Sequence, residues 1–151
     1  MSVVVLGRED PLAYPTMIGQ LASVGAGLLV DPFLRLDQVH QLVVSTQLDR
    51  LMISGRPREQ AVRAALGTYL DSPSLSRPIE VLESLGLHDR VLLASGGEVY
   101  TLGTSLNGVG RTTTVFTPLP PPAAEALRAE YDRLWNEAEL VGPAVDEPEV
   151  T

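Results

Sequence analysis

The residues best suited to chemistry lie between positions 88 and 110. Two apolar runs, 91–94 and 99–102, flank the pair Gly96-Gly97, a pattern that predicts a β-hairpin with a tight turn. A His-Asp-Arg triplet opens the hairpin, and a polar, glycine-punctuated loop follows its second strand. Because the start of one antiparallel strand lies beside the end of the other, we expect the triplet and the loop to meet.

Such a meeting would gather groups that could hold a phosphate. An arginine guanidinium is a planar fork that can grip two oxygens, and hydroxyl and amide groups can donate further hydrogen bonds. Each residue also has an ordinary explanation, since Arg90 could pair with Asp89 or Glu98 and since Ser, Asn and Gly favour turns. The candidate ligand-binding residues are His88, Arg90, Thr104, Ser105, Asn107 and Arg111.

This stretch resembles the signature half-site of the phospholipase D superfamily. That signature runs His-x-Lys, four residues, Asp, six residues, Gly-Ser and, soon afterwards, Asn. His88 and Arg90 stand at the His and Lys positions, and the acidic position falls on Ser95. With one extra residue, the end of the signature matches Gly103, Thr104 and Asn107. The chain is most similar to two single-motif branches, which are bacterial phospholipase D-like His-Asp-Arg domains and the C-terminal domain of MIT-domain proteins.

The resemblance implies a function as well as a fold. In an active member, His88 would be the nucleophile that attacks phosphorus, and a second histidine would protonate the leaving group. Since the chain carries one motif, a full site would need a homodimer in which each subunit contributes His88. Arginine in place of lysine and Ser95 in place of the acid indicate a degenerate site.

Three functions follow from this interpretation. The first is a binding or regulatory module for an anionic, phosphate-containing ligand or a protein partner, in a bacterial defence or mobile-element system as some relatives imply. The second is an active homodimeric phosphodiesterase, a nuclease or a lipase, that uses His88. The third is a purely structural oligomerisation domain.

Composition limits the partners. The 151 residues carry a formal net charge of −8 and no lysine, which disfavours a broad nucleic-acid surface. The absence of cysteine excludes disulfides and thiolate sites, and we expect neither a metal nor another cofactor. No apolar run approaches the roughly 18 residues of a membrane span, and the first six residues are too short for a signal peptide. A cytoplasmic location is therefore expected.

Hydrophobic periodicity predicts an α/β fold. Strands are expected at 2–6, 28–30, 51–55, 79–82 and 112–117 beside the hairpin, and helices at 16–24, 33–48, 57–70 and 123–139. This order predicts one domain over residues 1–141, a phospholipase D-like mixed sheet with helices on both faces. The acidic residues 142–151, with two prolines, are expected to be a disordered tail.

Four other polar residues have mainly structural interpretations. Asp31 follows a buried strand, where ligands often bind in open sheets, but Asp-Pro is also a common end of a strand. His40 has apolar neighbours on its helix and is expected to pack in the core. Arg56 and Arg58 begin a helix after a strand and are expected to be solvated there.

Overall fold

The computed structural model of the chain describes residues 3–145. In chain order the elements are β1 (Val4–Leu6), α1 (Ala13–Val24), β2 (Gly27–Val30), α2 (Leu36–Ser45), β3 (Arg50–Ser54), a 3₁₀ turn (Pro57–Glu59), α3 (Gln60–Leu70), β4 (Glu80–Ser84), β5 (Arg90–Ala94), β6 (Val99–Leu102), a second 3₁₀ turn (Leu106–Gly108), β7 (Thr114–Pro118), α4 (Pro121–Glu137) and β8 (Glu139–Gly142).

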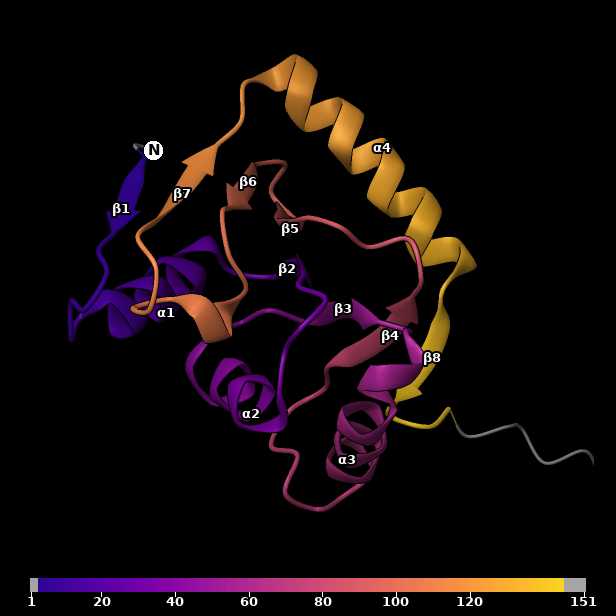
Figure 1. The fold of residues 1–151 in the computed structure, drawn as a ribbon. Helices are drawn as coiled ribbons and strands as arrows, with labels where there is room; N and C mark the ends of the chain where they lie inside the picture. The colour runs from indigo at the N-terminus through magenta and orange to yellow at the C-terminus, as the bar shows by residue number, and fades with distance from the viewer. Residues whose placement is uncertain (1–2, 146–151) are drawn as a thin grey trace, which may run out of the picture.

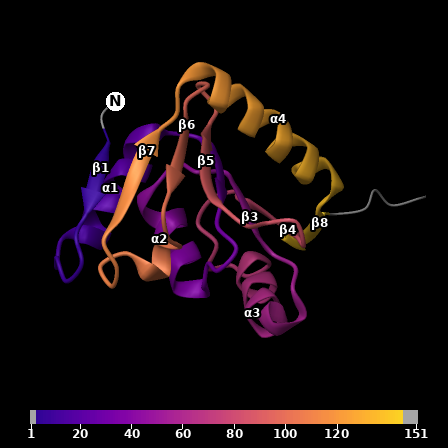
Figure 2. The same ribbon diagram turned by 45° about the horizontal axis from the view of Figure 1, so that its top comes forward.

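The strands form one mixed sheet in the order β1-β7-β6-β5-β2-β3-β4-β8. β2, β3 and β4 run parallel to one another, and the remaining pairs are antiparallel. Helices α1, α2 and α3 lie on one side of the sheet and α4 lies across the other (Figures 1 and 2). The predicted fold class, a mixed sheet flanked by helices on both faces, is confirmed.

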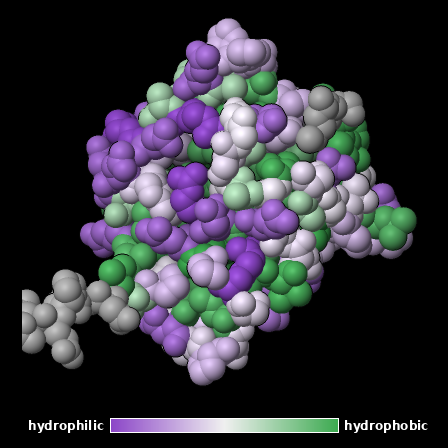
Figure 3. Space-filling model, turned by 180° about the vertical axis from the view of Figure 1, so that it is seen from behind, coloured by the Kyte–Doolittle hydropathy of each residue, from purple (hydrophilic) through white to green (hydrophobic). Residues whose placement is uncertain are grey.

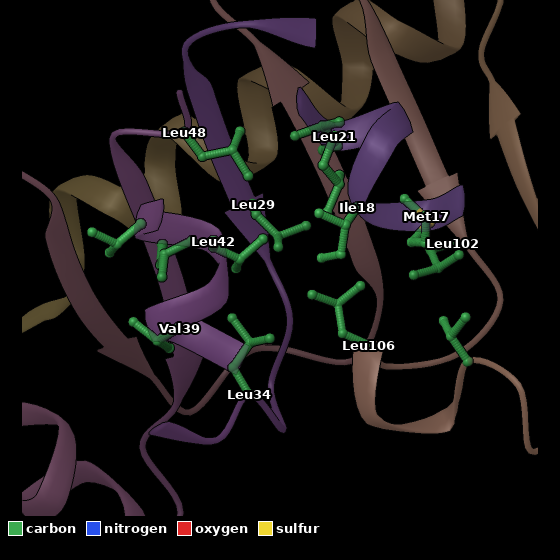
Figure 4. Close-up of a cluster of buried hydrophobic side chains, with 14 of the residues drawn as sticks. Met17, Ile18, Leu21, Leu29, Leu34, Val39, Leu42, Leu48, Leu102 and Leu106 are labelled. Carbon is green, nitrogen blue, oxygen red and sulfur yellow. The ribbon is translucent and has the colours of Figure 1, made fainter. Parts of the chain in front are cut away.

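Alternate residues of the central strands point to the two helical layers. Leu29, Leu51 and Leu92 pack with α1, α2 and α3, whereas their neighbours Val30 and Val91 pack with α4. Both faces of β2 are therefore buried, which explains its continuous apolar sequence. Figure 4 shows the larger cluster, in which side chains of α1 and α2 meet those of β2 and of the loop after β6.

Several helix boundaries differ from the prediction by two or three residues, and two of these differences have a clear local reason. The helix predicted from position 33 begins at Leu36, because residues 31–35 form a loop after β2 and the Gln38 side chain accepts a hydrogen bond from the backbone N of Arg35. The helix predicted from Pro57 opens with a 3₁₀ turn before α3.

The C-terminal part of the domain contains a strand that the sequence did not predict. α4 ends at Glu137, and Glu139–Gly142 form β8, which pairs with β4 at the edge of the sheet. The apolar stripe of α4 ends at Trp135, so the backbone is free to turn and pair with β4. Gly142 is thus buried in the sheet rather than the first residue of a tail. The predicted disorder of the rest of the tail stays a prediction, since 146–151 lie outside the described residues.

The visible face of the domain carries both hydrophilic and hydrophobic side chains. Viewed from behind, hydrophilic side chains gather on the side where α4 lies, among scattered hydrophobic ones (Figure 3). No helix within residues 3–145 has the length and apolar character needed to cross a membrane.

Candidate functional site

The candidate site lies at one end of the central strands. The predicted hairpin of β5 and β6 is confirmed, with Arg90 opposite Leu102. On its other side β5 pairs with β2, and Val91 lies opposite Val30. The start of β5, the end of β2 and the end of β6 therefore meet, which places Asp31 beside the His-Asp-Arg triplet and the polar loop.

Asp31 is the centre of this meeting point. Its side chain is fully buried, and both carboxylate oxygens accept hydrogen bonds from the polar loop. Ser105 Oγ donates to Oδ1 at 2.7 Å and the backbone N of Leu106 donates to Oδ2 at 2.8 Å. Burial raises the pKa of the Asp31 carboxyl, while these hydrogen bonds, one from Phe33 and the charge of Arg90 act against the rise.

Phe33 is held by the same group of residues. Its backbone N donates to Asp31 Oδ1 at 3.1 Å, and its carbonyl oxygen accepts from Asn107 Nδ2 at 3.0 Å. Ser105 and Asn107, two of the predicted phosphate ligands, therefore hydrogen-bond to other parts of the same chain. They join the loop after β6 to the loop after β2, so their polar groups already have hydrogen-bond partners within the protein.

Arg90 is the cation of the site. Its guanidinium carbon Cζ lies 5.8 Å from the centroid of the Phe33 ring, within the range of a cation–π contact. Its Nε is buried and has no hydrogen-bond partner. The alternative interpretation, an ion pair with Asp89 or Glu98, is not among the salt bridges of the described residues.

His88 is exposed, in the loop that leads from β4 to β5. The preceding Leu87 is buried against α4, and an added Cβ at Gly86 would lie 3.2 Å from Leu134 of that helix. Asp89 also lies near α4, because its charge, after burial, helps to raise the pKa of Tyr131 to about 12. The loop is thus anchored beside His88, while the imidazole itself is exposed.

The position of Ser95 overturns one part of the sequence argument. Ser95 follows the last residue of β5, and its backbone N bonds to the carbonyl of Ala26 at the far end of the sheet. At about 3.3 Å per residue, Arg90 and Ser95 are separated by roughly 16 Å. An acid at position 95 could not orient His88 of the same subunit, so its replacement by serine says nothing about that imidazole.

The other two predicted ligands take different places. Thr104 is half-buried, and its Oγ1 lies directly against Gly108 within the polar loop. Arg111 is exposed and lines a shallow groove of about 340 Å³ with Tyr14 and Asp37. Burial and then the charge of Asp37 raise the pKa of Tyr14 there. A role for Thr104 or Arg111 in anion contact stays a prediction.

Of the neighbouring arginines, Arg63 makes structural contacts and Arg56 lies in solvent. Arg63 lies 2.9 Å from Glu83 in a mostly buried ion pair and donates to the carbonyls of Ser54 and Arg56. It therefore joins the ends of β3 and β4. Arg56 is exposed, as expected.

His40 differs from its prediction. It is exposed rather than packed in the core, and its Nδ1 lies 2.8 Å from Tyr69 Oη on α3. The reason is that His40 stands at the border between α2 and α3, where the ring can bridge the two helices.

The sequence left the importance of two residues unrecognised. The sequence pattern places Phe33 in the helix predicted at 33–48 and Asp31 at the end of a buried strand. The one available signal was an acid after a buried strand, which suggests a polar role but does not name its partners. Ser105 and Leu106 lie more than seventy positions away in sequence, so only the sheet order reveals them.

Comparison with known proteins supports the fold. No model of a known protein family matches the sequence, and no curated protein matches it either. Among solved structures, the phospholipase D family member Nuc from Salmonella typhimurium is similar, with a TM-score of 0.62 and 16% identity over 92% of this chain and 97% of Nuc. NucT from Helicobacter pylori gives a TM-score of 0.56 and 11% identity over 92% of this chain and 97% of NucT.

A third similar structure is TrmBL2, described as an archaeal chromatin protein with a novel mode of DNA binding. Its TM-score is 0.54 at 15% identity, and the match covers 92% of this chain but only 54% of TrmBL2. Such low identities establish a likeness of fold alone. The chain has the phospholipase D-like fold, as its His-Asp-Arg hairpin predicted.

Proposed function

We propose that this domain binds a phosphate-type anion at His88 and Arg90 without hydrolysing it, as a regulatory or binding module. The observation that carries the proposal is the state of Arg90. Within residues 3–145 its guanidinium has no salt-bridge partner and its buried Nε has no hydrogen-bond partner. The charge of Arg90 acts on the neighbouring Asp31, but no salt bridge joins the two, and the Asp31 oxygens already accept three hydrogen bonds. A partly desolvated cation that lacks a direct ion pair favours the binding of an anion.

The surroundings of His88 support binding rather than turnover. A histidine nucleophile works best when a carboxylate or another acceptor fixes its tautomer and orientation. The nearest buried carboxylate along the sheet, Asp31, already accepts three hydrogen bonds from the protein. The histidine hydrogen bond found within the described residues belongs to His40, not to His88. One chain also supplies a single motif, where the chemistry needs two histidines.

A small anion suits the domain better than an extended polyanion. The net charge of −8 would repel a long nucleic acid, whose binding needs many cationic contacts. The DNA binding described for TrmBL2 belongs to that protein. We therefore propose that the ligand is a single phosphate-containing group, free or carried by a partner protein.

A direct test uses the two histidines as internal reporters. Inorganic phosphate or tungstate is expected to shift the ring resonances of His88 in NMR spectra of the full chain, while those of His40 stay in place. Arg90→Ala should weaken the apparent affinity by at least about tenfold, since a charge-assisted bond contributes roughly 1.5–3 kcal/mol. Arg56→Ala, which changes an exposed arginine outside the cluster, is the matched control. Unmoved His88 resonances at millimolar anion would refute the proposed binding.

The same preparation should release little product from bis-p-nitrophenyl phosphate. His88→Ala should leave that low rate unchanged, because a background reaction does not depend on the imidazole. Robust hydrolysis that disappears in His88→Ala would favour the active phosphodiesterase instead.

The proposal includes a homodimer, because one chain offers only one half-site and His88 lies exposed at its rim. Light scattering coupled to size-exclusion chromatography at micromolar concentration should give twice the chain mass of 16.2 kDa. A mass of one chain at micromolar concentration would refute a site shared between two subunits. Anion binding by a single subunit would then still be decided by the NMR test.

A further inference from the structure

Phe33 stands out among the residues near the site because side chains hold both of its backbone polar groups. Its backbone N and O are both held by side chains, Asp31 and Asn107. Asp31 is in turn fixed by Ser105 and Leu106. Ser105 and Asn107, two of the residues predicted as phosphate ligands, thus support the backbone that carries one aromatic ring.

That ring carries the Arg90 guanidinium. The 5.8 Å between Cζ and the ring centroid places the cation against the π-electrons, an arrangement that favours arginine over lysine because the guanidinium is planar and weakly hydrated. Without such a contact, a long arginine side chain would sample many rotamers and would lose that freedom on binding an anion.

The buried Nε determines which edge of the guanidinium is available. Nε is closed off from solvent, whereas the residue as a whole is only partly buried. The edge open to a ligand is therefore the end that carries Nη1 and Nη2. Two parallel N–H groups at that end match two oxygens on one central atom.

We propose that Phe33 is a positioning residue, which holds the Arg90 guanidinium so that Nη1 and Nη2 bind two oxygens of one tetrahedral oxyanion. The inference rests on the proposed anion binding and adds its ligand class, a phosphate or phosphate ester that presents two terminal oxygens. It also explains why arginine stands at position 90: lysine would offer a point charge without the planar face or the fork.

The test compares Phe33→Leu with Phe33→Tyr in the full chain. Leucine keeps an apolar side chain and both backbone hydrogen bonds but removes the ring, whereas tyrosine retains the π-face. Affinity for inorganic phosphate, measured by calorimetry, is expected to fall about tenfold in Phe33→Leu and to stay within about twofold in Phe33→Tyr. Arg90→Lys should bind as weakly as Phe33→Leu or more weakly.

A second measurement separates positioning from a general loss of structure. The Arg90 side-chain NMR resonances should be displaced by the Phe33 ring in the wild type and in Phe33→Tyr, and should return toward ordinary arginine values in Phe33→Leu. Equal phosphate affinity in wild type and Phe33→Leu would overturn the positioning role while leaving the proposed function intact. A wild type that binds no phosphate would overturn the proposed function, and this inference with it.

A competition experiment tests the proposed ligand class. Dimethyl phosphate and methyl phosphate, which each present at least two terminal oxygens, should compete with phosphate, whereas chloride at the same concentration should not. Equal competition by chloride would show a simple charge effect and would contradict the end-on geometry.

Discussion

Replacing Asp31 by alanine is expected to lower the free energy of unfolding by roughly 3–5 kcal/mol, as breaking a buried charged cluster does. The side chain is fully buried, and its removal leaves three donors without an acceptor: the hydroxyl of Ser105 and the backbone N–H groups of Leu106 and Phe33. Urea unfolding followed by circular dichroism would measure the loss.

The matched control is Asp132→Ala, because Asp132 is an exposed acid on α4. Its stability should stay within about 0.5 kcal/mol of the wild type. An Asp31→Ala protein as stable as this control would show that the loop after β6 does not depend on the carboxylate.

The same carboxylate predicts a dependence on pH. Burial raises the pKa of Asp31 above its unfolded-state value, so the folded protein binds the proton more strongly than the unfolded chain does. The stabilisation linked to this proton is complete below the unfolded-state pKa and is lost as pH rises through the folded-state pKa. Asp31→Asn lacks the linkage, so the stability advantage of the wild type over Asp31→Asn should be larger at acidic pH than at neutral pH.

Gly27→Ala is expected to destabilise the domain by about 3 kcal/mol, at the upper end of the usual cost of overpacking. A Cβ at position 27 would lie 2.5 Å from the carbonyl oxygen of Leu93 and 3.0 Å from Cα of Ala94. Both are backbone atoms of β5, so no side-chain rotation can relieve the contact, and β2 must separate from β5. Chemical denaturation monitored by tryptophan fluorescence, through Trp135, would report the loss.

Gly19→Ala is the control for Gly27→Ala. Gly19 lies within α1, and a Cβ there would meet no heavy atom within 4 Å. Alanine should stabilise this helix by about 0.5–1 kcal/mol because it restricts the unfolded backbone and favours the helix. If both variants were equally stable, the close approach of β2 to β5 would be wrong.

The order of elements could be predicted because each rests on local patterns. The apolar run Leu28-Leu29-Val30 predicts a strand buried on both faces, and the spacing of Met17, Ile18 and Leu21 predicts a helix with one buried face. The Gly96-Gly97 turn between two apolar runs predicts the β5–β6 hairpin. Short β8 escaped prediction, since a four-residue strand after a long helix has too few positions to establish a period.

The amino-acid sequence by itself determined the α/β class, the hairpin and the placement of His88 and Arg90 at its entrance, since periodicity and turn chemistry act over a few residues. Tertiary structure decided what the polar loop does. The side-by-side pairing of β2 and β5 brings Asp31 to Ser105 and Leu106 across more than seventy residues. A buried carboxylate must find hydrogen-bond donors, so these groups satisfy Asp31, and Phe33 becomes the surface on which Arg90 lies.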